Sequence, residues 1–298
     1  MTALPAVDPA QDRDRDGSAQ QRSSLRALLE NQSIEITPAQ AGDTGLADYL
    51  PQGSRVFVPW LPGADEDATI IAAIELRHQG MTPVPHITVR RIRNLASLGN
   101  LLRCLHDEAG VDEVLIVGGD VATPKGPFEA AVDVLESGVL LANGISRVGV
   151  GGYPEGHPAI SDPDLLNALL RKQAVADAAG LEAFVVTQFA FTAAPVIAWL
   201  EYVRAAGLRL PVHVGVPGPA RIGTLMRYAR MCGVSSSMKM FVRHGRGLAS
   251  TARVSKPNRM VRDLAGYCAE HPDSGMGPVH LYPFGGLTRT ADWVSKLY

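Results

Sequence analysis

One segment of the chain brings three side chains with acid–base or hydrogen-bonding chemistry close together. It reads Tyr153-Pro154-Glu155-Gly156-His157-Pro158 and follows Val148-Gly149-Val150-Gly151-Gly152, in which the valines alternate as they do in a β-strand. A strand that ends in glycines and leads into a proline-bounded loop with polar side chains is typical of an active site in a β/α protein. The reaction itself depends on the polar residues at the other strand ends.

Glu35 is a candidate for proton transfer. It lies between Ile34 and Ile36 in a predicted strand, and if both isoleucines pack against helices, Glu35 must point to the inside of the sheet. A carboxylate there is costly unless it is paired or its pKa is raised. Apolar surroundings would raise the pKa of Glu35 and make it a general acid. The alternative is a solvated glutamate at the edge of the strand.

Three more polar residues end or interrupt apolar runs. His86 lies within such a run and is either a core histidine or a functional one. Asp120 follows Gly118-Gly119, where the glycines allow a ligand to approach the backbone, although such pairs also occur in ordinary turns. The amide of Gln188 can donate and accept at once, which suits a planar heterocycle; the alternative is a hydrogen bond to a neighbouring strand end.

The remaining polar residues and the motifs that the chain lacks limit the reactions it could catalyse. Lys172 is either a solvated charge or a ligand for phosphate, and His213 and His280 are expected to have structural roles. The histidines fall on separate predicted elements without metal-ligand spacing, and the chain has no Gly-x-Ser-x-Gly elbow or Walker loop. The polar residues therefore favour binding of a large planar cofactor and donation of one proton over nucleophilic hydrolysis.

The elements that must position these residues alternate between strand and helix. Such alternation indicates parallel strands joined by crossover helices. Eight units in this length, with no Gly-x-Gly-x-x-Gly turn after any strand, favour an α/β fold of the (β/α)8 TIM barrel type over an open doubly wound sheet. The strands are predicted at 32–37, 55–60, 84–89, 113–117, 146–152, 182–188, 211–216 and 279–282. The helices are predicted at 24–31, 65–79, 95–109, 127–137, 163–179, 193–206, 222–231, 254–270 and 289–297.

The composition is that of an ordinary globular protein. The 298 residues are 46% hydrophobic and 19% charged, with a net charge of −2, which gives no electrostatic argument for nucleic acid or a membrane as partner. No apolar run reaches about 18 residues, the minimum for a membrane span. Residues 1–24 are expected to form a disordered tail and residues 25–298 the single catalytic barrel. Cys104, Cys232 and Cys268 suit reduced thiols in a cytoplasmic protein, and a homo-oligomer is left open.

Five short segments, taken in order, resemble the catalytic domain of methylenetetrahydrofolate reductase, with the bacterial type as the nearest form. They cover about residues 33 to 285, and the Tyr-Pro-Glu-x-His-Pro segment is the most specific of them. The segments are Ile34-Glu35-Ile36-Thr37-Pro38, Pro85-His86-Ile87-Thr88, Gly118-Gly119-Asp120, Tyr153-Pro154-Glu155-Gly156-His157-Pro158 and Thr187-Gln188-Phe189.

The resemblance implies a flavin-dependent oxidoreductase of one-carbon and methionine metabolism. Such an enzyme passes hydride from NADH or NADPH to FAD, and then from reduced FAD to 5,10-methylenetetrahydrofolate, by ping-pong kinetics. On the same basis the catalytic residues are Glu35, as the general acid, and Asp120, which lies between flavin and folate, tunes the flavin and binds the folate. Gln188 contacts the pterin, and Ile222 is near a position that stacks on substrate. The positions matched to FAD binding are His86, Gly118, Gly119, Asp120, Ala131, Tyr153, His157, Asp164 and Lys172.

The chain also departs from the family pattern. Pro59 stands where relatives often have a threonine that touches the flavin, and Gly118 stands where some have an arginine. The stretch between Lys172 and Gln188 is several residues longer than in common relatives. A regulatory domain, and with it inhibition by adenosylmethionine, is not expected. The alternatives are a flavin-free folate-binding barrel acting in one-carbon transfer and a non-catalytic barrel that acts as an interaction partner.

Overall fold

The fold is built around one parallel sheet that closes on itself. The computed structural model describes residues 19–43, 45–119, 121–234 and 254–297. The strands of the sheet are β1 (Ser33–Glu35), β2 (Arg55–Val58), β3 (Thr82–Thr88), β4 (Glu113–Val117), β5 (Arg147–Gly152), β6 (Glu182–Thr187), β7 (Val212–His213), β8 (Gly215–Pro217) and β11 (His280–Tyr282). They pair in the order β7-β6-β5-β4-β3-β2-β1-β11-β8, and the pairs are parallel.

The barrel closes through β7 and β8, which are two halves of one predicted strand. His213 of β7 pairs with Val186 of β6, while Gly215 of β8 pairs with His280 of β11. Gly215 passes so close to Thr187 that a Cβ atom would overlap its carbonyl oxygen, and the Gly215 N–H donates to Thr187 Oγ1 at 2.8 Å. The strand divides because its first half follows β6 and its second half follows β11. The predicted (β/α)8 barrel is confirmed.

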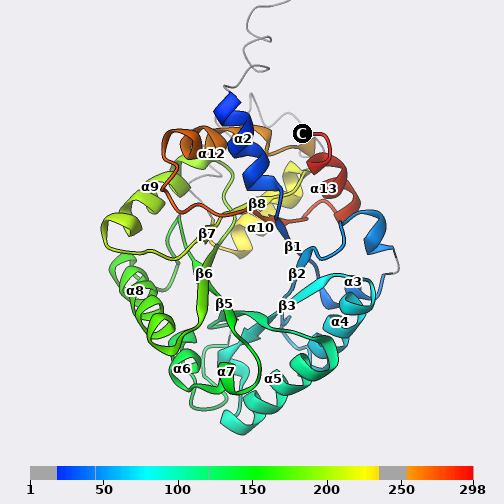
Figure 1. Ribbon diagram of the computed structural model, residues 1–298, viewed down its shortest axis with the longest axis vertical. Helices are drawn as coiled ribbons and strands as arrows, with labels where there is room; N and C mark the ends of the chain where they lie inside the picture. Colours follow the sequence, from blue (N-terminus) through cyan, green and yellow to red (C-terminus); the bar gives the residue numbers. More distant parts are fainter. Residues whose placement is uncertain (1–18, 44, 120, 235–253, 298) are drawn as a thin grey trace, which may run out of the picture.

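Helices surround the barrel, as Figure 1 shows for α4, α5, α6, α8 and α9. Their bounds are α2 (Ala19–Leu29), α3 (Pro38–Ala41), α4 (Glu66–His78), α5 (Leu95–Ala109), α6 (Ala131–Glu136), α7 (Val139–Ala142), α8 (Asp162–Ala179), α9 (Ala193–Ala205), α10 (Ile222–Met231), α12 (Asn258–Glu270) and α13 (Leu287–Val294). Two 3₁₀ turns, η1 (Leu46–Asp48) and η2 (Val89–Arg91), and an antiparallel pair, β9 (Ala220–Arg221) with β10 (Val254–Ser255), complete the described elements.

The N-terminal helix begins earlier than predicted. α2 starts at Ala19, so the expectation of a disordered tail up to residue 24 is wrong for residues 19–24; residues 1–18 lie outside the described part of the chain. The polar sequence here is helical because α2 packs against α12, where Gln20 Nε2 donates to the carbonyl oxygen of Ala269 at 2.7 Å. Leu28 and Leu29 at its end are buried.

Every second residue of each strand points into the barrel, and these residues form three layers. At the amino ends of the strands, Glu113 Oε2 lies 2.9 Å from Arg147 Nη1 and its Oε1 lies 3.3 Å from Arg55 Nη1. Burial raises the pKa of Glu113, and the two arginines act against that rise. Above this ion pair lies an apolar layer, which separates it from the polar residues at the carboxyl ends. Its members are Phe57, Val84, Leu115, Phe184 and Val186.

The buried ion pair predicts a large effect of one substitution. Glu113→Gln leaves Arg55 and Arg147 without their anion inside the barrel, so we expect the free energy of unfolding to fall by about 3 kcal/mol. The matched control is Glu182→Gln, because Glu182 also pairs with Arg147 but its side chain is 78% exposed; its effect should stay below about 1 kcal/mol. Urea denaturation measures both, and equal effects would contradict the assignment.

Candidate functional site

Glu35 lies at the carboxyl end of the barrel between two histidines. Its Oε2 is 3.5 Å from His86 Nε2 and 3.8 Å from His280 Nε2. His280 Nδ1 lies 2.8 Å from Ser33 Oγ, a contact that fixes the ring with Nε2 toward Glu35. Both Nε2 atoms are buried and hydrogen-bonded to no described residue. We call the group of Glu35, His86, His280 and Tyr282, at the carboxyl ends of the strands, the barrel mouth.

His280 therefore belongs to the site, although its residue type alone suggested a structural role. It points inward on β11, and β11 is the neighbour of β1 in the closed sheet, which brings it beside Glu35. The sequence pattern that could have identified His280 as a site residue is its alternation with Tyr282 on the last predicted strand. His213, the other histidine expected to be structural, stacks on Phe184 at 4.7 Å deeper in the barrel and contacts Arg55 at 3.4 Å.

The pKa of Glu35 lies below its ordinary value, so the predicted rise is wrong. Burial does raise the pKa of Glu35, but the contact with His280 and the charges that His86 and His280 can carry lower it by more. The cause is that the neighbouring strands supply two imidazoles instead of an apolar wall. Burial in turn lowers the pKa of His86 to about 4. At neutral pH the site thus holds an ionised carboxylate beside a neutral His86.

An aromatic wall stands on one side of Glu35. Tyr228 of α10 stacks on Phe284 at 4.1 Å, and Phe284 stacks in turn on Tyr282 at 5.7 Å. Burial, followed by the charge of Glu35, raises the pKa of Tyr282 well above its ordinary value, and its hydroxyl donates to the carbonyl oxygen of Thr187 at 3.1 Å. This wall suits a planar ligand. The motifs did not identify it, and Ile222 itself is only the half-buried first residue of α10.

The loop after β5 folds back over the strand that precedes it. The ring of Tyr153 meets that of His157 edge-on at 5.2 Å, and His157 Nδ1 accepts from the Ala159 N–H at 3.2 Å. A Cβ atom on Gly151, which faces into the barrel, would lie 3.3 Å from the Tyr153 hydroxyl. Burial raises the pKa of Tyr153. The loop thus places Tyr153 over an inward position next to the barrel mouth.

Gly118 and Gly119, after β4, and Gln188, after β6, lie at the carboxyl end of the barrel. Gly119 has a φ of 99°, and a Cβ atom there would overlap Thr88 Cγ2, so this position requires glycine. Gly118, by contrast, faces open space, and Asp120 lies outside the described residues. The backbone N–H of Gln188 donates to the Gly152 carbonyl at 2.8 Å, and its Oε1 accepts from the Phe189 N–H at 3.3 Å.

Three predicted cofactor positions lie on the outer helices. Ala131 is buried at the start of α6, and Asp164 accepts a hydrogen bond from Ser161 Oγ at 2.6 Å in the first turn of α8. Burial lowers the pKa of Lys172, and its amine makes no hydrogen bond or ion pair with any described residue. A half-buried cation without a counter-charge fits an anion such as the phosphates of the FAD that the resemblance implies.

The described part of the chain contains no group of three or more His, Cys, Asp or Glu side chains arranged to hold a metal ion. Within the same residues, no helix has both the length and the apolar character needed to cross a membrane.

The buried histidines predict how stability depends on pH. The pKa is about 4 for His86 and about 3 for His213 in the folded chain, against an ordinary value of 6.5. Because the unfolded chain binds these protons first, the free energy of unfolding should fall as pH drops from 6.5 to 4, by about 1.4 kcal/mol per pH unit for each group. Urea denaturation from pH 7 to 4.5 measures this slope. His213→Asn should reduce it, and the exposed control His78→Asn should not; equal slopes in wild type and His213→Asn would refute the assignment.

Comparison with known proteins gives a consistent group of matches. Residues 47–284 match the family model described as Methylenetetrahydrofolate reductase. The chain is 32% identical over 130 residues to Methylenetetrahydrofolate reductase 2 of Saccharomyces cerevisiae, covering 41% of this chain and 21% of that protein. It is 34% identical over 140 residues to Methylenetetrahydrofolate reductase 1 of Schizosaccharomyces pombe, covering 43% and 21%. The matched part thus spans about a fifth of either relative.

A solved structure shares the fold. It superposes with a TM-score of 0.57 at 10% identity, covering 91% of this chain and 96% of the other. That structure is described as "Uncharacterized protein from Clostridium thermocellum binds two copies of 5-methyl-5,6,7,8-tetrahydrofolic acid".

Proposed function

The chain belongs to the methylenetetrahydrofolate reductase family, and from this premise we propose that it interconverts 5,10-methylenetetrahydrofolate and 5-methyltetrahydrofolate at the barrel mouth, with NADH or NADPH as the other substrate. One observation carries the proposal: a carboxylate held between two imidazoles, at the carboxyl ends of the strands and beside an aromatic wall. Glu35 precedes the residues that match the family model, so its role rests on this geometry.

The reaction needs one proton and one hydride. Opening the methylene bridge breaks its bond to N10, which takes a proton and leaves an iminium at N5; hydride addition to the iminium carbon then gives the methyl group. Glu35 Oε2 is the proposed donor to N10. In the reverse direction the same carboxylate accepts that proton. A general acid of this kind contributes about 10²- to 10⁴-fold to a rate.

Because its pKa is lowered, Glu35 must first gain a proton before it can act as a general acid. The Glu35 side chain is 23% exposed, and a planar ligand against the aromatic wall would remove that exposure. Further loss of solvent favours the neutral form of a carboxyl group, so substrate binding itself would help Glu35 to hold the proton. The neutral His86 lies beside Glu35 Oε2 without adding a charge that would compete for the proton.

FAD is the proposed hydride carrier. When bound, it would take hydride from NADH or NADPH and give it to folate in a separate step, which is ping-pong kinetics. The unpartnered amine of Lys172 supports a phosphate-bearing group beside α8. Gln188, Asp120 and Ile222 are the proposed folate contacts. The other proposed contacts with FAD are His86, Gly118, Gly119, Asp120, Ala131, Tyr153, His157 and Asp164.

A second candidate is a barrel that binds folate and acts in one-carbon transfer without flavin. Two observations favour it. Pro59 and Gly118 offer neither a hydroxyl nor a guanidinium group, and the side chains of Asp164 and His157 already bond to Ser161 and Ala159. In this case Lys172 would meet the anionic end of another ligand.

Flavin binding separates the two candidates. If FAD is the carrier, the purified protein is yellow or takes up added FAD, with quenching of flavin fluorescence. Lys172→Gln should weaken FAD binding about tenfold or more, because a charge-assisted contact with phosphate is lost. The control is Arg171→Gln, whose exposed side chain pairs with Glu136. A colourless protein that takes up no FAD would overturn the first candidate, and turnover of folate with NADH would then be tested directly.

Glu35 can be tested separately from the flavin. In anaerobic stopped-flow, Glu35→Gln should leave reduction of the flavin by NADH nearly unchanged and slow the folate half-reaction by about 10²-fold or more. Glu182→Gln, an exposed glutamate on β6, is the control and should change neither step. Equal slowing of both half-reactions in Glu35→Gln would make Glu35 structural.

A further inference from the structure

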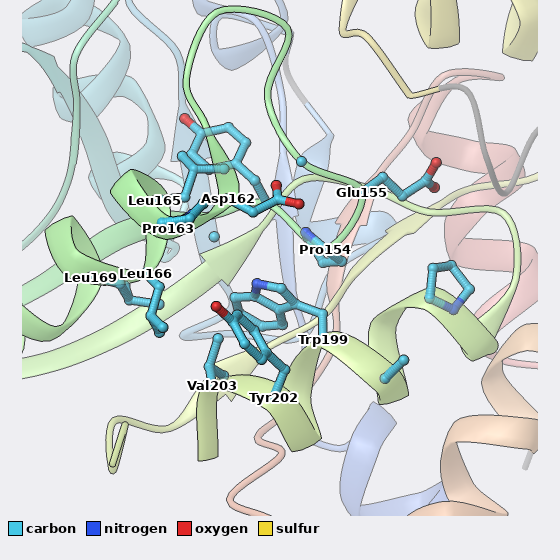
Figure 2. A pocket seen from close by; sticks show the side chains of 16 residues that line it. Pro154, Glu155, Asp162, Pro163, Leu165, Leu166, Leu169, Trp199, Tyr202 and Val203 are labelled. Carbon is cyan, nitrogen blue, oxygen red and sulfur yellow. The ribbon is translucent and has the colours of Figure 1, made fainter. Parts of the chain in front are cut away.

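A cavity lies between α8 and α9, beneath the loop after β5. Its volume is about 660 Å³, within the range of small-molecule sites, about 300–1,000 Å³. Of the described residues proposed to bind FAD, Tyr153 alone lines it, and Glu35 does not. Figure 2 shows Trp199, Tyr202 and Val203 rising from α9, with Asp162, Leu165 and Leu166 of α8 on the opposite side.

The walls of this cavity suit a flat ring. Leu166 and Leu169 of α8 form an apolar side, and the aromatic rings of Trp199 and Tyr202 form the other. The indole of Trp199 packs against Gly152 at the end of β5. A Cβ atom on Gly152 would lie 3.0 Å from Trp199 Cη2, so glycine at this strand end lets Trp199 pack against β5. Aromatic side chains fixed in this way form stacking surfaces.

The N–H of Trp199 is available to a ligand. Trp60 Nε1 donates to the Ala64 carbonyl at 2.9 Å, and Trp293 Nε1 donates to Asn258 Oδ1 at 2.7 Å. Trp199 Nε1 has no such partner among the described residues, although it lines a partly enclosed cavity. This N–H is therefore free to donate to a ligand that enters the cavity and carries an acceptor.

At the rim of the cavity, Asp162 supplies a hydrogen-bond acceptor. Its carboxylate lines the cavity and makes no hydrogen bond or ion pair within the described ranges. Gly156, with a φ of 78°, passes beside it, and a Cβ atom there would lie 3.1 Å from Asp162 Oδ1. Ionised carboxylates bind best to two parallel N–H donors. The cavity thus presents a carboxylate for paired donors, one N–H donor and two aromatic faces.

We propose that this cavity binds a fused heteroaromatic ring with a 2-amino-4-oxopyrimidine edge, the edge that pterins and guanine share. The amino group and the adjacent ring N–H would donate to Asp162, a ring acceptor would take the Trp199 N–H, and the ring would lie between Trp199, Tyr202 and the leucines of α8. The site is separate from the proposed reaction at the barrel mouth and does not depend on it.

The test compares three probes on the full chain. Pterin and lumazine differ in that lumazine has an oxo group in place of the 2-amino group, and guanosine carries the same edge on a purine. The chain has three tryptophans, so ¹H–¹⁵N spectra give three indole signals, assigned with Trp199→Phe. Pterin should shift the Trp199 signal and leave those of Trp60 and Trp293 in place, with binding at least about tenfold tighter than lumazine. A stronger response to guanosine than to pterin would assign the same edge to a nucleobase.

Variants make the test specific to the cavity. Asp162→Asn should remove the preference for pterin over lumazine, and Ala198→Phe should fill the cavity and abolish the shift. Ala168→Phe is the matched control, because Ala168 is an exposed alanine on α8 that does not line the cavity. The Trp60 and Trp293 signals report whether each variant is folded. Equal binding of pterin and lumazine, an unshifted Trp199 signal at saturating probe, or unchanged binding in Ala198→Phe would each overturn the proposal.

Discussion

A closed barrel has one interior, and every second residue of each strand has to be accommodated there. In this chain that constraint places Glu113 between two arginines at the amino end, fills the middle with apolar side chains and leaves Glu35 at the carboxyl end. Phe57 lies beneath the two histidines and contacts the His280 ring at 4.6 Å. The apolar layer therefore separates Glu35 from the ion pair at the amino ends of the strands.

The barrel mouth combines two features that the proposed folate reaction requires. A flat ring needs an apolar face, which Tyr228, Phe284 and Tyr282 form, and a leaving nitrogen needs a proton at one defined point. At neutral pH His86 is uncharged and Glu35 is ionised. Its protonation then depends on how far a bound ligand excludes water, which couples binding to chemistry.

Alternation along β5 gives its last two glycines different neighbours. Gly151 faces inward and leaves room for Tyr153, while Gly152 faces outward and leaves room for Trp199. Side chains larger than hydrogen at these adjacent positions would displace Tyr153 or Trp199. The two glycines that first marked this segment in the sequence thus make room for different side chains, and both line the cavity between α8 and α9.

The sequence by itself determined the local elements and the direction of their side chains. The bounds predicted for α5, β4 and α10 are those of the structure, because propensity and hydrophobic period are local properties, and the same alternation turned Glu35 inward. Tertiary structure decided what Glu35 meets there. The division of 211–216 into β7 and β8, the approach of His280 and the lowered pKa of Glu35 all follow from which strands become neighbours on closure. Pairing between β1 and β11 joins residues nearly 250 positions apart, so no local pattern records it.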